Sequence, residues 1–112
     1  MGKLPEDRQN VYLVDFGLAK EHLDMNTGKP FQPRRNTDFR GTIPYASLTA
    51  HLKKELGRKD DLWSFFFVIL EFLDEPLSWK TNTCKDSVRD CKTKAFNKPQ
   101  KYLFPNLQQR YP

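Results

Sequence analysis

The chain has 112 residues, of which 38% are apolar and 13% aromatic, and its formal net charge is +5. This length supports one small domain or part of one, and the nine phenylalanines predict that much ring surface is buried, which excludes a chain that is disordered throughout. The excess charge is local, because residues 80–101 hold seven basic side chains against two acidic ones and the rest of the chain is balanced.

Cysteine usage and hydropathy exclude two further classes. Cys84 and Cys91 stand seven apart, with no Cys-x-x-Cys pattern and no histidine at metal-ligand spacing, so a zinc site is excluded and reduced thiols are expected. The longest apolar run, residues 65–70, is far shorter than the ~20 residues of a bilayer span, and no signal-peptide pattern is present. We expect a protein of the cytosol or the nucleus that has no membrane contact.

The first half of the chain predicts a strand and a long loop. Residues 1–10 are polar and lead into Val-Tyr-Leu-Val at 11–14, a β-branched and aromatic run typical of a short buried strand, which ends at Asp15. Residues 18–40 show no sustained period and are interrupted by glycine and proline, so they predict a loop of the kind that is functional or disordered. Residues 41–47 carry mixed turn and extended signals.

The second half predicts helices. Residues 48–56 favour a short helix with Gly57 as its C-terminal cap. Asp60 and Asp61 favour the N-terminus of a helix over residues 60–73, which is apolar on nearly every face. A helix of that kind has to be surrounded by protein, and the chain offers few other elements to cover it.

The basic stretch at residues 80–101 contains a predicted amphipathic helix over residues 86–96. A solvated loop and helix face is the favoured interpretation of its charges, ahead of a surface for nucleic acid, an acidic substrate or a membrane. His51 is expected to have a surface or packing role, and Trp79 is expected to anchor the core.

Four short motifs follow one another in the chain. A carboxylate at the mouth of a buried strand, followed by a glycine, can hold a divalent cation against phosphate oxygens. The motifs are Val-Tyr-Leu-Val-Asp-Phe-Gly-Leu-Ala-Lys at 11–20, Arg-Gly-Thr-Ile-Pro-Tyr-Ala-Ser at 40–47, Gly-Arg-Lys-Asp-Asp-Leu-Trp-Ser-Phe-Phe at 57–66 and Leu-Ser-Trp at 77–79. In this order they resemble the metal-binding segment, substrate-positioning loop and central helix of protein kinases of the casein kinase 1 superfamily, closest to the tau-tubulin kinase branch.

The resemblance implies a mainly α, partial protein-kinase-like fold. It corresponds to the C-terminal lobe, with a short β segment before the Asp-Phe-Gly and a buried central helix. Residues 1–112 would then form one partial kinase domain, divided into a strand and metal-binding segment at 11–17, activation and substrate-positioning loops at 18–50, the central helix at 60–73 and a basic tail at 80–112.

The resemblance also implies roles for particular residues. Asp15 would ligate magnesium, with Phe16 and Gly17 beside it in a site for ATP and Mg²⁺, the cofactors of the complete domain. Thr42 would help to orient the catalytic loop, and Asp61 would anchor the backbone of that loop. Each has a plainer alternative: Asp15 as a turn residue, Thr42 as a strand-end hydroxyl and Asp61 as a helix cap.

A basic group is a candidate anion site. The resemblance implies a protein substrate that is acidic or already phosphorylated, and arginine forks suit phosphate. The alternative is that these are solvated loop charges. The candidate residues are Arg34, Arg35, Arg58 and Lys59.

The sequence also departs from the family pattern. Pro44 stands where the family usually has Arg, Thr49 where Asn is usual and Ser78 where Pro is usual, so substrate choice stays open. The Gly-rich loop, the phosphate-pairing Lys and the His-Arg-Asp-x-x-x-x-Asn pattern that phosphoryl transfer requires are absent from the sequence.

We therefore expect a fragment of a Ser/Thr protein kinase that is inactive alone, with its exposed apolar area covered by the missing N-terminal lobe or another protein surface. The alternative is a non-catalytic, pseudokinase-like interaction module. A nucleic-acid-binding protein is a weaker third hypothesis, because it draws only on the basic stretch and lacks a recognised binding fold.

Overall fold

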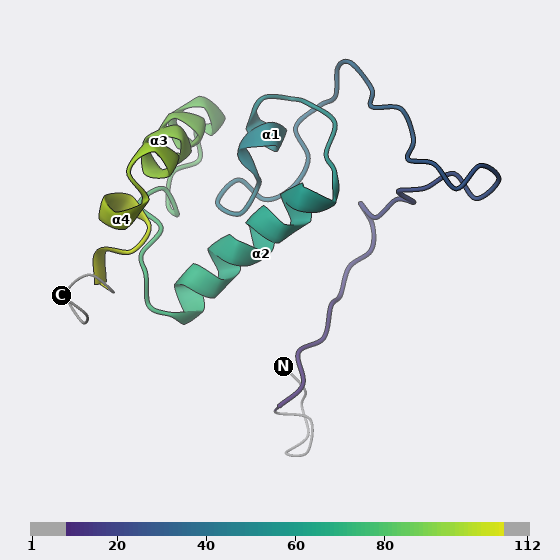
Figure 1. Cartoon of the computed structure of the whole chain (residues 1–112). Helices are drawn as coiled ribbons and strands as arrows, with labels where there is room; N and C mark the ends of the chain where they lie inside the picture. Colours follow the sequence, from purple (N-terminus) through teal and green to yellow (C-terminus); the bar gives the residue numbers. More distant parts are fainter. Residues whose placement is uncertain (1–8, 107–112) are drawn as a thin grey trace.

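The computed structural model describes residues 9–106. Within them the chain forms four helices, α1 (Leu48–His51), α2 (Arg58–Phe72), α3 (Lys85–Asn97) and α4 (Pro99–Tyr102), and no strand. The helices gather between residues 48 and 102, whereas residues 9–36 run away from them as extended chain and loop (Figure 1). The last six residues of the predicted basic tail, like residues 1–8, lie outside the described part.

The strand expected at residues 11–14 does not form, and this prediction was wrong. These residues lie within the described part, and they are exposed, with Val11 at 81% and Leu13 at 83% exposure. β-propensity expresses how well a side chain packs on a sheet, and no neighbouring strand offers that surface here. Between residues 9 and 106 the β pairing is one antiparallel bridge between Leu23 and Pro30, which closes a turn in the extended loop.

The boundary between α1 and α2 differs from the sequence prediction. The expected helix over residues 48–56 is shorter, because α1 ends at His51 and Lys53 then takes a left-handed φ of 53°. Gly57 therefore does not cap α1; it is the N-cap of α2. Its N–H donates to the Asp60 carboxylate at 2.8 Å, so Asp60 supplies the predicted capping from the first turn.

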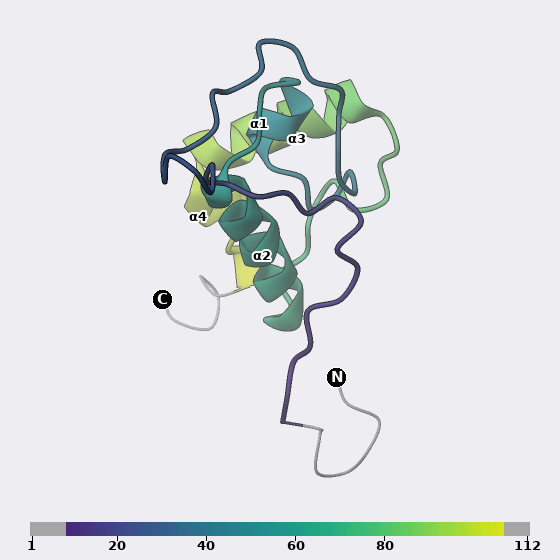
Figure 2. The same ribbon diagram turned by 90° about the vertical axis from the view of Figure 1, so that its right-hand side faces the viewer.

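The core lies between α2, α3, α4 and the turn that joins α2 to α3. Phe67 and Trp79 are fully buried and meet edge to face, with ring centroids 5.6 Å apart. The prediction that Trp79 anchors the core is confirmed. α3 packs against both α1 and α4, and Figure 2 shows α1 and α3 side by side with α2 below them. The apolar members of the core are Phe67, Leu70, Leu77, Trp79, Val88, Ala95 and Leu103.

Burial of α2 is one-sided. Phe67 and Leu70 face the core, but Leu62, Phe65 and Phe72 on the other side of the helix are 69%, 59% and 76% exposed. The prediction of a buried central helix therefore holds for one face only. We call these three side chains the apolar stripe of α2. Within the described residues, no helix is long enough and apolar enough to span a membrane.

Candidate functional site

The Asp-Phe-Gly turn lies on the exposed chain that precedes the helices. Asp15 has a left-handed φ of 64°, and its Oδ1 accepts the N–H of Gly17 at 3.2 Å. The carboxylate thus stabilises its own turn, as the plainer interpretation expected, while the residue as a whole is exposed. Phe16 is 66% exposed.

Asp15 fits one position of a magnesium site. Mg²⁺ prefers six oxygen ligands, and proteins often supply one or two carboxylates while substrate phosphates and water complete the shell. Within the described residues no group of three or more His, Cys, Asp or Glu side chains is placed to hold a metal ion. The role of Asp15 as a metal ligand therefore stays a prediction.

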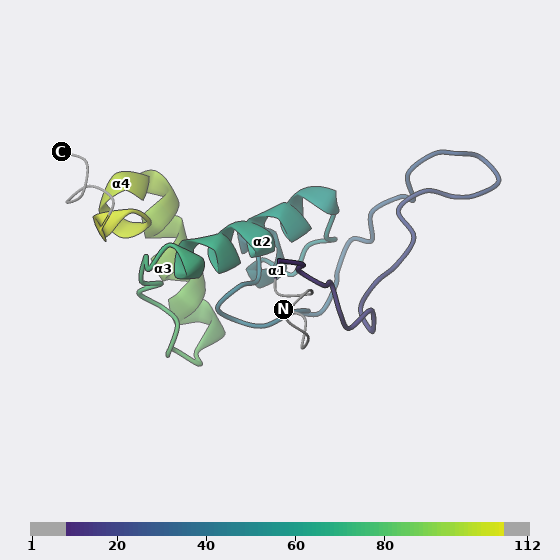
Figure 3. The same ribbon diagram turned by 90° about the horizontal axis from the view of Figure 1, so that it is seen from below.

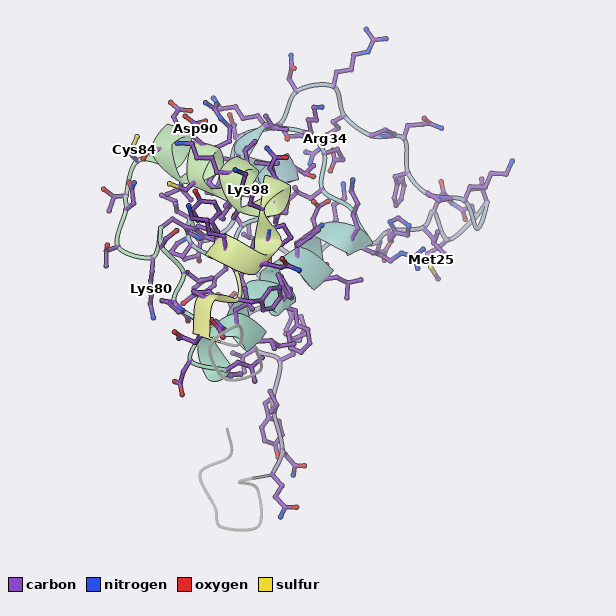
Figure 4. All side chains as sticks on the ribbon, turned by 60° about the vertical axis from the view of Figure 1, so that its left-hand side comes forward. Met25, Arg34, Lys80, Cys84, Asp90 and Lys98 are labelled. Carbon is purple, nitrogen blue, oxygen red and sulfur yellow. The ribbon has the colours of Figure 1, made fainter. Side chains whose placement is uncertain are left out.

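Glu55 fastens the extended loop to the start of the helical part. Its Oε2 accepts from Arg34 Nε at 2.6 Å, and its Oε1 accepts from Arg34 at 3.1 Å and from Lys20 at 2.8 Å. These bonds hold the pKa of the Glu55 carboxyl well below its usual range and raise that of Arg34. Figure 4 shows Arg34 near the helices and Met25 far out on the loop, and Figure 3 shows that the loop projects away from α2.

The candidate anion-binding residues are brought only partly together. Arg34 forks onto Glu55, which precedes Arg58, the first residue of α2, by three positions in the chain. Arg35, Arg58 and Lys59 are exposed. The Glu55 carboxylate neutralises much of the charge of Arg34, so this arginine is less available to an anion than the other three residues.

Thr42 and Asp61 have local roles in this structure. The carbonyl of Thr42 accepts the N–H groups of Tyr45 at 3.0 Å and Ala46 at 2.9 Å, which forms a turn. Asp61 is exposed in the first turn of α2, next to the buried Asp60. Their expected contacts with a catalytic loop remain predictions.

The turn that Thr42 begins is held by side chains from distant parts of the chain. We call residues 43–46 the anchored segment. Trp79 Nε1 donates to the Pro44 carbonyl at 2.9 Å, and the Tyr45 hydroxyl donates to Glu71 Oε2 at 2.8 Å. Lys80 forms an ion pair with the same Glu71 carboxylate at 2.7 Å, which lowers the pKa of Glu71.

Lys92 of α3 makes the remaining contacts with this segment. Its Nζ donates to the Ala46 carbonyl at 2.6 Å and to the Ile43 carbonyl at 2.9 Å. The Nζ also lies 3.1 Å from His51 Nε2, and it sits over the ring of Phe67, 5.0 Å from the centroid. Three carbonyls of the anchored segment are thus bound by two buried side chains.

Burial decides the electrostatics of this cluster. Lys92 is fully buried, and the loss of solvation lowers its pKa from 10.5 to about 7. His51 is 8% exposed; burial, and then the charge of Lys92, lower its pKa to about 4. His51 is therefore neutral at pH 7, and its burial agrees with the packing alternative and not with the surface one.

Sequence reasoning missed Lys92 because it assigned the whole basic stretch to a solvated face. The signal was present in the spacing. Lys92 follows Val88 by four residues and precedes Ala95 by three, so it lies on the apolar face of α3. Glu55 and Glu71 were also missed, and no local pattern marks them, because Arg34 lies 21 residues from Glu55 and Tyr45 lies 26 residues from Glu71.

All 112 residues of this chain align with part of a protein kinase. A probable serine/threonine-protein kinase of Dictyostelium discoideum is 41% identical over 112 residues, which cover 100% of this chain and 21% of that protein. The chain thus spans about a fifth of the length of this curated relative. No family model matches it. This similarity supports a kinase-like region in the chain. It agrees with the general resemblance of the four motifs to protein kinases.

Proposed function

We propose that the chain forms part of the C-terminal lobe of a protein Ser/Thr kinase of the casein kinase 1 superfamily, in the tau-tubulin kinase branch. The observation that carries the proposal is the 41% identity to a probable Ser/Thr kinase along all 112 residues. The finer placement rests on the Ala-Ser pair at 46–47 and on the run that opens α2 at residues 57–66.

In the complete domain this part would contribute a metal ligand and a substrate surface. Asp15 would hold Mg²⁺ against the phosphates of ATP, which supplies the transferred γ-phosphoryl group. Residues 40–50 would place the Ser or Thr of a protein substrate. The exposed Arg35, Arg58 and Lys59 would favour acidic or phosphorylated substrates.

The apolar stripe of α2 supports the proposal that another protein segment covers this helix. Leu62, Phe65 and Phe72 lie on one side of α2 and are all more than half exposed. Isolated apolar side chains are normal on surfaces, but an aligned stripe on a helix is typical of a contact face. A further part of a kinase domain would cover this stripe. We expect the protein in the cytosol or the nucleus.

The alternative is a non-catalytic interaction module. The feature that favours it is the same exposed stripe, which a protein partner could cover. On this reading the stripe of α2 binds a protein partner, and Asp15 is only a turn residue.

A chimera tests the proposal. The matched region of the Dictyostelium kinase is replaced by this chain, and transfer of phosphate from ATP to an acidic protein substrate is measured with Mg²⁺ present. We expect an active chimera whose kcat falls on the order of 100-fold or more with Asp15→Ala, because a charge that stabilises the transferring phosphoryl group is lost. The isolated 112-residue chain is expected to be inactive.

The matched control is Asp38→Ala, which removes an exposed carboxylate elsewhere in the loop and should leave activity unchanged. A chimera that folds, as judged by circular dichroism, but transfers no phosphate would contradict the kinase proposal and favour the interaction module. Equal losses in the two variants would contradict the role of Asp15 as metal ligand.

A further inference from the structure

Burial of the charged Lys92 side chain costs more free energy than burial of an apolar side chain would. An ammonium group moved from water into a protein interior loses its solvation, and a methionine of similar length would fill the same volume without that loss. The atoms within hydrogen-bond distance of its Nζ are the carbonyl oxygens of Ile43 and Ala46 and the Nε2 of His51. Each of these belongs to, or follows closely on, the turn that Thr42 begins.

The ammonium group has three possible acceptors. All three accept when His51 carries its proton on Nδ1, a buried atom with no hydrogen-bond partner among the described residues, and the rings of Phe67 and Trp79 face the charge at 5.0 and 5.7 Å. A neutral amine at the same place still donates to two carbonyls and accepts from the other tautomer of the imidazole. The cluster therefore keeps its hydrogen bonds in both protonation states of Lys92.

The two carbonyls fix the path of the anchored segment. Ile43 and Ala46 stand on either side of Pro44 and Tyr45, so a single Nζ holds both ends of the segment. Trp79 holds the carbonyl between them. A backbone held at three carbonyls has little freedom to move its side chains relative to α3.

We propose that Lys92, seated against His51, is a positioning residue that holds residues 43–46 in the conformation that receives a peptide substrate. The part that concerns substrate rests on the proposed function, in which residues 40–50 place the peptide. The part that concerns the anchored segment rests on the contacts of Lys92 alone.

The first experiment measures amide hydrogen exchange by NMR in the 112-residue chain with Lys92→Met. The amides of Tyr45 and Ala46, which donate to the Thr42 carbonyl, should exchange about tenfold faster or more, while those in the middle of α2 keep their rates. Lys94→Met is the matched control: it makes the same chemical change two residues away on α3, where the side chain is exposed. Equal exchange in the two variants would overturn the proposal.

A second variant covers the case in which Lys92→Met does not fold. His51→Phe keeps a ring beside Phe39, with which His51 is in contact at 5.2 Å between centroids, and removes one of the three acceptors of Nζ. The same two amides should exchange faster than in the unsubstituted chain, by less than with Lys92→Met. Unchanged exchange in a folded His51→Phe chain would overturn the proposal.

The second experiment uses the chimeric kinase and separates substrate placement from chemistry. With Lys92→Met, KM for a peptide substrate should rise roughly tenfold or more, while KM for ATP and the kcat at saturating peptide change little. A merely structural role would lower the amount of active enzyme and leave KM for the peptide unchanged, and that result would overturn the substrate role. An inactive chimera would count against the proposed function, and amide exchange alone would then decide on the anchored segment.

Discussion

At the scale of single residues, burial gives two basic groups properties that their types do not predict. Lys92 and His51 lie within hydrogen-bond distance of each other inside the core. Arg89 of the same helix adds a further positive charge that disfavours protonation of His51. Both pKa values are therefore lowered, Lys92 to about 7 and His51 to about 4.

These shifts predict how stability changes with pH. Between pH 7 and 10.5 the unfolded chain keeps the proton of Lys92 and the folded chain has released it, so the free energy of unfolding should rise with pH. The rise is at most about 1.4 kcal/mol per pH unit from this group. Through His51, acidification from pH 6.5 toward 4 should lower stability for the same reason. Urea unfolding at pH 7 and pH 9 measures the first effect.

Substitution isolates the contribution of Lys92. The chain with Lys92→Met should lose the gain in stability between pH 7 and 9, whereas Lys94→Met should keep it, because Lys94 is exposed. Identical pH slopes in all three proteins would show that Lys92 is solvated in solution.

At the scale of elements, the sequence predicted helices well and the strand badly. The helices expected over residues 60–73 and 86–96 occur as Arg58–Phe72 and Lys85–Asn97, because capping side chains and apolar spacing act within a few residues. A strand depends on hydrogen bonds from another segment, and local sequence does not reveal whether that segment is present. The exposed run at residues 11–14 illustrates this limit.

The start of α2 offers a test of capping with two adjacent carboxylates. Asp60→Ala removes the acceptor of the Gly57 N–H and should destabilise the chain by about 1 kcal/mol, up to about 2. Asp61→Ala changes an exposed side chain and should stay within about 0.5 kcal/mol of the unsubstituted chain. The midpoint of urea unfolding distinguishes the two variants. Equal losses of stability in both would argue against a capping role for Asp60.

At the scale of the whole molecule, the core is small and lies under one face of α2. The aromatic content predicted buried ring surface, and Phe67 and Trp79 supply it. The sequence could not tell which face of an evenly apolar helix is covered, because a helix of that kind carries no polar side to mark the solvent.

Two phenylalanines on the same helix therefore differ in their contribution to stability. Phe67→Ala empties a fully buried site and should cost ~3–5 kcal/mol, which is a large share of the ~5–15 kcal/mol that holds a typical domain folded. Phe72 is 76% exposed, so Phe72→Ala should change the thermal midpoint little. Circular dichroism during heating measures both, and a large loss with Phe72→Ala would mean that its face is covered in solution.

The sequence predicted those parts of the candidate site whose residues are neighbours in the chain. The Asp-Phe-Gly turn was visible because its three residues adjoin, and its Asp15–Gly17 hydrogen bond spans two positions. The anchored segment was assigned a substrate-positioning role by resemblance, but its supports at Glu71, Trp79 and Lys92 lie 26 to 49 residues along the chain from their partners. Contacts of that separation arise from packing, which no short pattern encodes.

That separation sets an order of events during synthesis. A ribosome makes the chain from its N-terminus, at roughly 5–20 residues per second, so residues 43–46 emerge well before the side chains that hold them. Glu71 is translated first, then Trp79, and Lys92 last, which is 49 positions after Ile43. The segment on which substrate placement would depend thus takes its final form only after most of α3 has left the ribosome.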